Sequence, residues 1–127
     1  MSDTPDIVPY LSYRDGAAAI DFLTQAFGFE VVQRQDDGDT LQHAELRHGN
    51  GIVMMGTADL PKGSPGLYLV VEDVAAHHER AMAVGATEVY PPEPTEWGTW
   101  RWRAQDPEGH EWSFGTYAPS TVALDRA

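Results

Sequence analysis

The amino-acid sequence predicts an α+β fold made of two tandem βαβββ modules within a single domain. The first supporting observation is an internal repeat, because residues 13–18 recur as residues 71–76 and residues 51–57 recur as residues 110–116. The second is the order of periodic segments, which is the same in both copies. A chain of 127 residues can bury most of its apolar surface as one domain, so each copy is a module. We expect module one at about 7–57, a linker at about 58–65, module two at about 66–117 and a C-terminal tail at 118–127.

Module one begins with a strand that leads into a helix. The β-branched and aromatic residues at 7–13 favour a strand, and Pro9 places it at a sheet edge. Asp15 then offers an N-cap, apolar residues recur at the three-to-four spacing of an amphipathic helix, and Gly28 ends it. Alternation and turn residues, above all Gly49-Asn50-Gly51, predict three more strands, at 29–35, 40–48 and 52–55.

Module two repeats this order. A strand at 67–71 precedes a helix that Asp73 caps and Gly85 ends. The turn at 106–109 joins the last two strands, and we expect it to pair Gln105 with His110. The remaining predicted strands start at 87 and lie at 99–104 and 111–117, and the tail after them is expected to be loosely held or to contact a second chain.

Four histidines are assigned structural or surface positions. His77 and His78 on the second helix and His48 beside a turn are expected at the solvated surface. His110 follows the turn glycine and is expected to fix the hairpin by bonding local backbone.

Composition excludes several classes of partner and site. The chain has no cysteine and therefore no disulfide or thiolate site. Its formal charge of −12 repels nucleic-acid phosphates and anionic lipid surfaces. No apolar run approaches the ~20 residues that cross a bilayer, and the beginning of the sequence is acidic and polar. We therefore expect a cytoplasmic protein that binds neither nucleic acid nor a membrane.

The order of the strands, helix ends and turns in the duplicated module resembles that of a known superfamily. The resemblance is to the vicinal oxygen chelate superfamily of glyoxalases, extradiol dioxygenases and bleomycin-resistance proteins, and in particular to its bleomycin-resistance-like or PhnB-like branch. It rests on Val8-Pro9-Tyr10-Leu11, on the helix ending Ala26-Phe27-Gly28-Phe29, and on Trp97-Gly98 followed by residues 106–117. It implies that the modules form a curved, cup-shaped mixed sheet with the helices outside and a ligand pocket within.

The resemblance also tests for a metal site. Metal-dependent relatives place ligands seven residues before each helix-capping Asp and at one position on the last strand of each module. Carried over residue by residue, these positions fall on Val8, Met54, Gly66 and Ser113. None of them is a carboxylate or an imidazole, so we expect no metal and no other cofactor.

Strand alternation predicts which side chains line the cup. We expect an apolar, aromatic surface with a few polar groups, the profile of a small-molecule pocket. Trp97, in a loop, is expected at the rim of the cup. The other candidate ligand-binding residues are Tyr10, His43, Glu45, Met54, Tyr68, Trp100, Trp102, Glu111 and Ser113. The opposing interpretation is that aromatic residues at this spacing are ordinary sheet core.

His43 and Glu45 form the close imidazole–carboxylate pair of the predicted cup face. Such a pair suits a general base with its orienting acid, or an unconventional metal site, and it also occurs as a satisfied polar pair at a strand end. We treat the two residues as weak catalytic candidates.

Two functions follow from these expectations. The first is metal-independent binding or sequestration of a small aromatic or cationic compound by a homodimer, as the resemblance to antibiotic-resistance proteins implies. The alternative is a divalent-metal-dependent lyase, isomerase or dioxygenase with non-standard ligands such as His43, Glu45 and Glu111. The sequence leaves open whether the chain is an enzyme.

Overall fold

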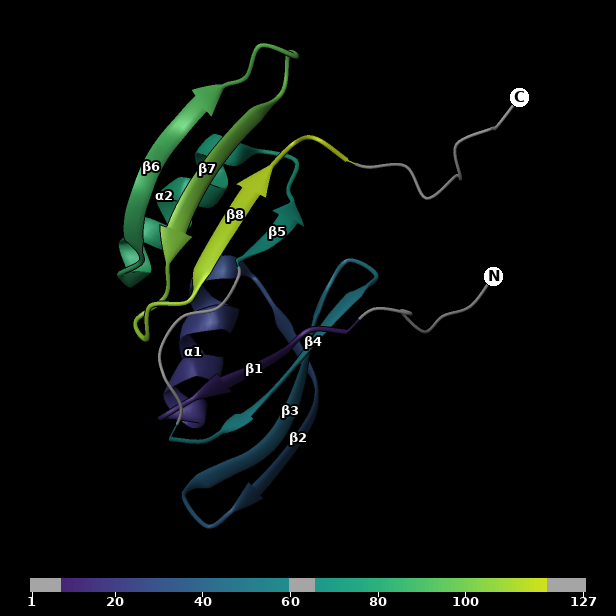
Figure 1. Ribbon diagram of the computed structural model, residues 1–127, viewed down its shortest axis with the longest axis vertical. Coiled ribbons are helices and arrows are strands. Elements are labelled where there is room, and N and C mark those ends of the chain that lie inside the picture. Colours follow the sequence, from purple (N-terminus) through teal and green to yellow (C-terminus); the bar gives the residue numbers. More distant parts are fainter. Residues whose placement is uncertain (1–7, 60–65, 119–127) are drawn as a thin grey trace, which may run out of the picture.

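The computed structural model describes residues 8–59 and 66–118 (Figure 1). It consists of two four-stranded mixed sheets, each carrying one helix, which confirms the predicted α+β fold with its two βαβββ copies. Most of the predicted linker and tail, at 60–65 and 119–127, lies outside the described residues. The elements are β1 Tyr10–Tyr13, α1 Gly16–Phe27, β2 Glu30–Asp37, β3 Thr40–His48, β4 Gly51–Thr57, β5 Leu67–Val70, α2 Val74–Val84, β6 Thr87–Pro94, β7 Trp100–Gln105 and β8 Glu111–Gly115.

The two sheets have the same topology. Their strand orders are β1-β4-β3-β2 and β5-β8-β7-β6, and in each the first strand runs parallel to its neighbour while the remaining pairs are antiparallel. Tyr10 of β1 lies opposite Met54, and Tyr68 of β5 lies opposite Ser113. The repeat in the sequence is therefore a repeat in space, in which the two tyrosines are equivalent.

Both helices begin and end at the residues that the sequence marks. The Asp15 and Asp73 carboxylates accept hydrogen bonds from the backbone N–H groups of Ala18 and Ala76, each at 3.0 Å. Gly28 and Gly85 then take left-handed φ angles of 83° and 105°, which a glycine adopts without steric cost. No helix in the described ranges is both long and apolar enough to cross a membrane.

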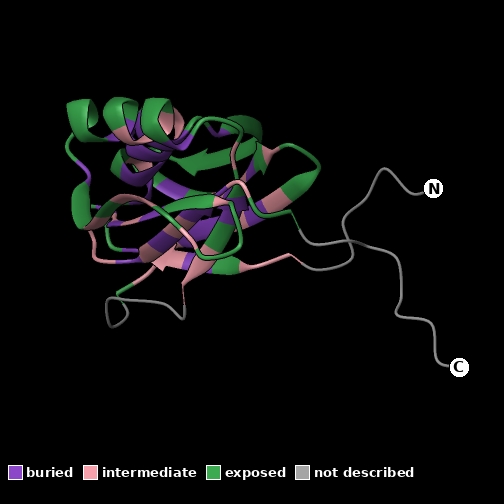
Figure 2. Ribbon diagram, turned by 90° about the horizontal axis from the view of Figure 1, so that it is seen from above, coloured by how far each residue is buried: buried purple, intermediate pink, exposed green. Residues whose placement is uncertain are grey.

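The hydrophobic core crosses from one module to the other. Helices α1 and α2 pack together, and Figure 2 shows buried segments toward the centre of the molecule, with the outer sides of the helices exposed. The ring of Phe27, the last residue of α1, lies 4.9 Å from the ring of Phe114 and 5.6 Å from that of Trp112, both in module two. Burying each large side chain contributes about 2 kcal/mol, so the modules stabilise each other directly.

His77 is part of this core. Its ring centroid lies 4.3 Å from that of Phe114, and its Nδ1 accepts a hydrogen bond of 3.1 Å from Trp102 Nε1. The predicted surface position of His77 is therefore wrong, because the helix packs this ring between aromatic side chains of module two. The neighbouring His78 also points inward, where it meets Trp102 edge-on and bonds Glu88 at 2.6 Å.

Two more histidines join the modules. His48 Nε2 lies 2.7 Å from the carbonyl oxygen of Val70, and His110 Nε2 lies 2.9 Å from that of Ser12. Val70 and Ser12 occupy equivalent places in the repeat, so each hairpin bonds the first strand of the other module. The prediction that His110 bonds local backbone is wrong, because its side chain bonds Ser12 of the other module. His48 remains partly exposed, but it also bonds the other module, which sequence-local reasoning does not reveal.

Candidate ligand-binding site

The first sheet presents four of the predicted site residues on one face. Glu45 and Tyr10 both lie opposite Met54, on its two neighbouring strands, which confirms that these side chains share a face. His43 Nε2 lies 2.9 Å from Glu45 Oε2, and the Tyr10 ring stacks beside the imidazole with 6.4 Å between centroids. Both members of the pair are about one-third exposed, so the face is open to a ligand.

The second sheet differs from the prediction by one residue of register. Gln105 pairs with Glu111 and not with His110, because Asp106 N–H bonds the His110 carbonyl and only three residues form the turn. A slip of one residue moves every side chain to the opposite face. Trp102 is therefore opposite Phe114 in the core, with no exposed surface, and its predicted place in the cup is wrong.

Arg103 takes the place on the ligand face that was predicted for Trp102. It lies opposite Ser113, and its guanidinium donates from Nε to Glu111 Oε1 at 2.7 Å and from Nη1 to Ser113 Oγ at 2.7 Å, while Nη2 lies 2.7 Å from the same Glu111 oxygen. Glu111 and Ser113 are thus on the predicted face, but both are engaged by an arginine that the sequence reading missed. The missed signal was the alternation itself, since a three-residue turn places Arg103, and not Trp102, on the face of Glu111 and Ser113.

A tyrosine lies over a glycine at the same point of each sheet. A Cβ on Gly56 would lie 2.6 Å from the Tyr10 hydroxyl, and one on Gly115 would lie 2.5 Å from the Tyr68 hydroxyl. The same Cβ atoms would also lie 2.9 and 3.0 Å from backbone carbonyl oxygens, so no side chain fits there without moving the strands. The two glycines let the phenol rings lie across the sheet.

An open aromatic cavity lies in module two. Its volume is about 760 Å³, and it is lined by Tyr68, Trp97, Trp100 and Tyr117 together with Thr95, Thr99 and Arg101. All four aromatic side chains are substantially exposed, Trp97 the most at 76%. Trp97, Trp100 and Tyr68 were predicted as site residues, and the cavity brings them together. Tyr117, which the sequence reading assigned only to a strand end, joins them because its carbonyl accepts a 2.7 Å hydrogen bond from the Tyr68 hydroxyl.

Two threonines hold the loop that carries Trp97. Thr95 Oγ1 accepts hydrogen bonds from the backbone N–H groups of Trp97 and Thr99, at 3.2 and 3.3 Å. The Thr99 hydroxyl lies 2.7 Å from the Thr95 hydroxyl, and Gly98 between them has a φ of +83°. The rim position predicted for Trp97 is thus a tight turn whose outermost side chain is the indole.

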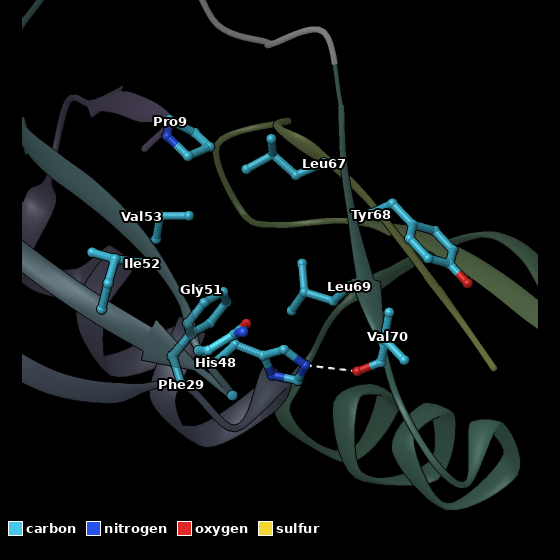
Figure 3. A pocket seen from close by; sticks show the side chains of 12 residues that line it. Pro9, Phe29, His48, Gly51, Ile52, Val53, Leu67, Tyr68, Leu69 and Val70 are labelled. Carbon is cyan, nitrogen blue, oxygen red and sulfur yellow. Dashed lines mark hydrogen bonds between the residues drawn. The ribbon is translucent and has the colours of Figure 1, made fainter. Parts of the chain in front are cut away.

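A smaller groove follows the seam between the modules (Figure 3). It has a volume of about 350 Å³ and apolar walls, where Leu67 and Leu69 of β5 face Ile52 and Val53 of β4. The hydrogen bond from His48 to the Val70 carbonyl crosses one end of the groove. It contains none of the charged groups of the two sheet faces.

Sequence comparison matches the Glyoxalase/Bleomycin resistance protein/Dioxygenase superfamily over residues 7–114. The chain belongs to this superfamily. Two uncharacterized members, Mb0911c of Mycobacterium bovis and Rv0887c of Mycobacterium tuberculosis, are each 36% identical to it over 126 residues, covering 87% of this chain and 82% and 74% of theirs.

Solved structures of the superfamily have the same architecture. TioX from Micromonospora sp. ML1 superposes with a TM-score of 0.77 at 34% identity, covering 87% of this chain and 97% of TioX. Glyoxalase I from Zea mays superposes with a TM-score of 0.73 at 22% identity, covering 89% of this chain and 44% of the maize chain. The likeness to the maize enzyme concerns the fold alone.

Metal-dependent members of the superfamily imply a divalent ion, and the donor set of this chain does not fit one. Val8 and Gly66 supply no donor atom, Met54 supplies a thioether, and the Ser113 hydroxyl is bonded to the Arg103 guanidinium at 2.7 Å. A fixed positive charge at this point opposes the binding of a divalent cation. In residues 8–59 and 66–118, no group of three or more His, Asp or Glu side chains is arranged around a common point that could hold a metal.

Proposed function

We propose that this superfamily member is a metal-independent binding protein, of the bleomycin-resistance-like or PhnB-like branch, that sequesters a small aromatic or cationic compound. The observation that carries the proposal is the cavity of about 760 Å³ walled by Tyr68, Trp97, Trp100 and Tyr117. Its size is that of a pocket for a drug-sized molecule, and four large apolar side chains remain exposed around it. An antibiotic is one class of compound that such a protein removes from solution.

The aromatic walls account for affinity toward flat rings. Stacked or edge-to-face contacts with tryptophan and tyrosine contribute about 1 kcal/mol each beyond the burial of apolar area. A cation over an indole gains a comparable amount, and the net charge of −12 attracts cations to the protein. Both arguments support binding, and neither requires a reacting group.

We also propose that the protein works as a homodimer. The side chains of Tyr10, Tyr68 and Trp100 are each about half exposed in the single chain. Exposed aromatic surface of this kind is typical of a surface that a second subunit or a ligand covers. A partner module placed over either sheet would close the cup around its ligand.

The metal-dependent alternative rests on His43 and Glu45, whose side chains are paired and open to the ligand face. Metal analysis of protein purified without chelators separates the two functions. We expect less than a tenth of an equivalent of Zn, Mn, Fe or Ni. Stoichiometric metal that disappears in His43→Ala would support the lyase, isomerase or dioxygenase alternative.

Removing one indole from the cavity tests the binding function. We expect Trp97→Ala and Trp100→Ala each to weaken the binding of naphthalene compounds by about tenfold or more, because each substitution removes one wall of the cavity. Isothermal titration calorimetry with 2-naphthoate, 2-acetonaphthone and 2-naphthylmethylammonium measures the effect. Val89→Ala, which shortens an exposed side chain of β6 outside the cavity, is the control and should bind as the unmodified protein does. If none of the three compounds binds the unmodified protein, the proposal is wrong.

A further inference from the structure

Arg103 is the polar centre of the ligand face of module two. Its guanidinium contacts both module-two positions to which the metal-ligand pattern of the relatives carries over. Nη1 bonds Ser113 Oγ at 2.7 Å, and a Cβ on Gly66 would lie only 3.1 Å from Nη2. Because Gly66 has no side chain, the guanidinium group fits at a position where metal-dependent relatives carry a metal ligand.

The guanidinium is held by two side chains, but not all of its N–H donors are used. Glu111 Oε1 accepts a hydrogen bond from Nε and lies 2.7 Å from Nη2, and Ser113 Oγ accepts one from Nη1. A guanidinium has five N–H donors, so at least one on each Nη atom has no hydrogen-bond acceptor in the described part of the chain. The Arg103 side chain is 31% exposed.

This centre adjoins the aromatic cavity. Tyr68, which lines the cavity, lies directly opposite Ser113 on the neighbouring strand. Gly66, two residues earlier and on the same face as Tyr68, is the residue over which the guanidinium lies. Arg103 does not line the cavity itself, but a ligand that extends from Tyr68 past Ser113 along this face would meet its guanidinium.

We propose that Arg103 is the specificity-determining residue of the site, and that it recognises an acceptor oxygen, carbonyl or carboxylate, on a planar aromatic ligand. The inference rests on the proposed binding function and narrows its ligand class. Unengaged N–H donors on a planar guanidinium match the lone pairs of such an oxygen. A cationic substituent would instead meet a positive group whose counter-ion, Glu111, is already engaged.

The charges of Arg103 and Glu111 determine which acceptor group, carbonyl or carboxylate, binds more tightly. Arg103 and Glu111 are together neutral, so a neutral carbonyl is bound without leaving a net charge at the face. A carboxylate gains more from the donors but also meets the Glu111 carboxylate. Removing that negative charge in Glu111→Gln is therefore expected to favour the carboxylate selectively.

Calorimetric titration with the three naphthalene probes tests the inference. The unmodified protein should bind 2-acetonaphthone and 2-naphthoate at least tenfold more tightly than 2-naphthylmethylammonium. Arg103→Met keeps the aliphatic stem but removes the donors, and it should lower the affinity for both acceptor probes by about tenfold while changing that for the cation by less than twofold. Glu111→Gln should strengthen 2-naphthoate binding by about fivefold relative to 2-acetonaphthone.

The Arg103→Lys variant controls for the possibility that Arg103→Met loses binding only because it misfolds. It retains the charge but not the planar pair of donors, and its near-ultraviolet circular dichroism should match that of the unmodified protein while the preference for acceptor probes is reduced. Equal binding of all three probes, or an unchanged ranking in both Arg103 variants, would overturn the assignment to Arg103 and leave the binding function standing. Failure of every probe to bind would overturn both.

Discussion

Asp106→Asn is expected to lower the free energy of unfolding by about 3 kcal/mol, because it disrupts a buried carboxylate that joins the modules. Asp106 is 3% exposed, and its Oδ2 accepts hydrogen bonds from the Tyr13 hydroxyl at 2.6 Å and from Trp112 Nε1 at 3.1 Å. Its Oδ1 accepts from the backbone N–H groups of Glu108 and His110, both at 3.1 Å. An asparagine has one acceptor oxygen, so in either orientation its NH₂ group faces at least one N–H donor.

The Tyr13 hydroxyl remains a donor throughout the accessible pH range. Burial, together with the negative charge of Asp106, raises the pKa of Tyr13 far above its ordinary value. Tyr13→Phe therefore removes a single donor and should cost about 1 kcal/mol, less than Asp106→Asn.

Urea denaturation followed by tryptophan fluorescence measures both changes. The matched control is Asp36→Asn, an exposed carboxylate of β2 that pairs with Arg34 at 2.9 Å, which should change the unfolding free energy by less than about 0.5 kcal/mol. An Asp106→Asn variant no less stable than Asp36→Asn would contradict the structural role of the buried carboxylate.

Lowering the pH from 7 to 4 is expected to destabilise the protein through His77. Burial lowers the pKa of this imidazole from 6.5 to about 4; the backbone of Phe27 opposes this shift, and the neighbours His48, Arg80 and His78 add to it. Its Nε2 has no hydrogen-bond partner within the described ranges, and its Nδ1 accepts the Trp102 N–H, which requires the neutral ring. A protonated His77 would place a charge among Phe27, Phe114 and Trp102.

The direction of this change in the free energy of unfolding follows from the number of protons that each state binds. Between pH 6.5 and about 4 the unfolded chain holds a proton on this ring and the folded chain does not. The stabilisation is therefore fully present above pH 6.5, is lost as the pH falls towards 4, and changes no further below it. The loss amounts to about 2 kcal/mol after allowance for the partial exposure of the ring.

The measurement compares unfolding free energies at pH 7 and pH 4 for the unmodified protein and for His77→Gln. Glutamine can accept the Trp102 N–H but does not titrate, so this variant should lose about 2 kcal/mol less than the unmodified protein over the same interval. His78→Gln, at the adjacent position, is the control and should keep the part of the pH dependence that His77 causes. Identical pH dependence in His77→Gln and in the unmodified protein would exclude His77 as the cause.

The local features of the fold could be predicted from the sequence because each depends on a few neighbouring residues. Asp15 and Asp73 cap their helices, Gly28 and Gly85 end them, and the hairpin at Gly49 to Gly51 forms where the turn residues stand. The first sheet face, with Glu45 and Met54 paired, followed from that hairpin.

The second face could not be predicted because its register depends on a tertiary interaction. Asp106 accepts two backbone N–H groups of its own turn while it bonds Tyr13 of the other module. These bonds tighten the turn by one residue and exchange Trp102 for Arg103 on the ligand face. The positions of His48 and His110 are likewise set by contacts between modules, and that of His77 by Trp102 and Phe114 on distant strands of its own module. Periodicity along the chain does not encode such contacts.

The placement of Phe27 has a consequence for how the molecule unfolds. Its side chain ends the helix of module one and lies against Trp112 and Phe114 in module two. Opening either sheet therefore exposes apolar surface of both, and neither copy of the repeat retains a complete core by itself. We therefore expect the duplicated halves to unfold as one cooperative unit, in which the amide protons of the buried strands of both sheets exchange with solvent through the same global opening.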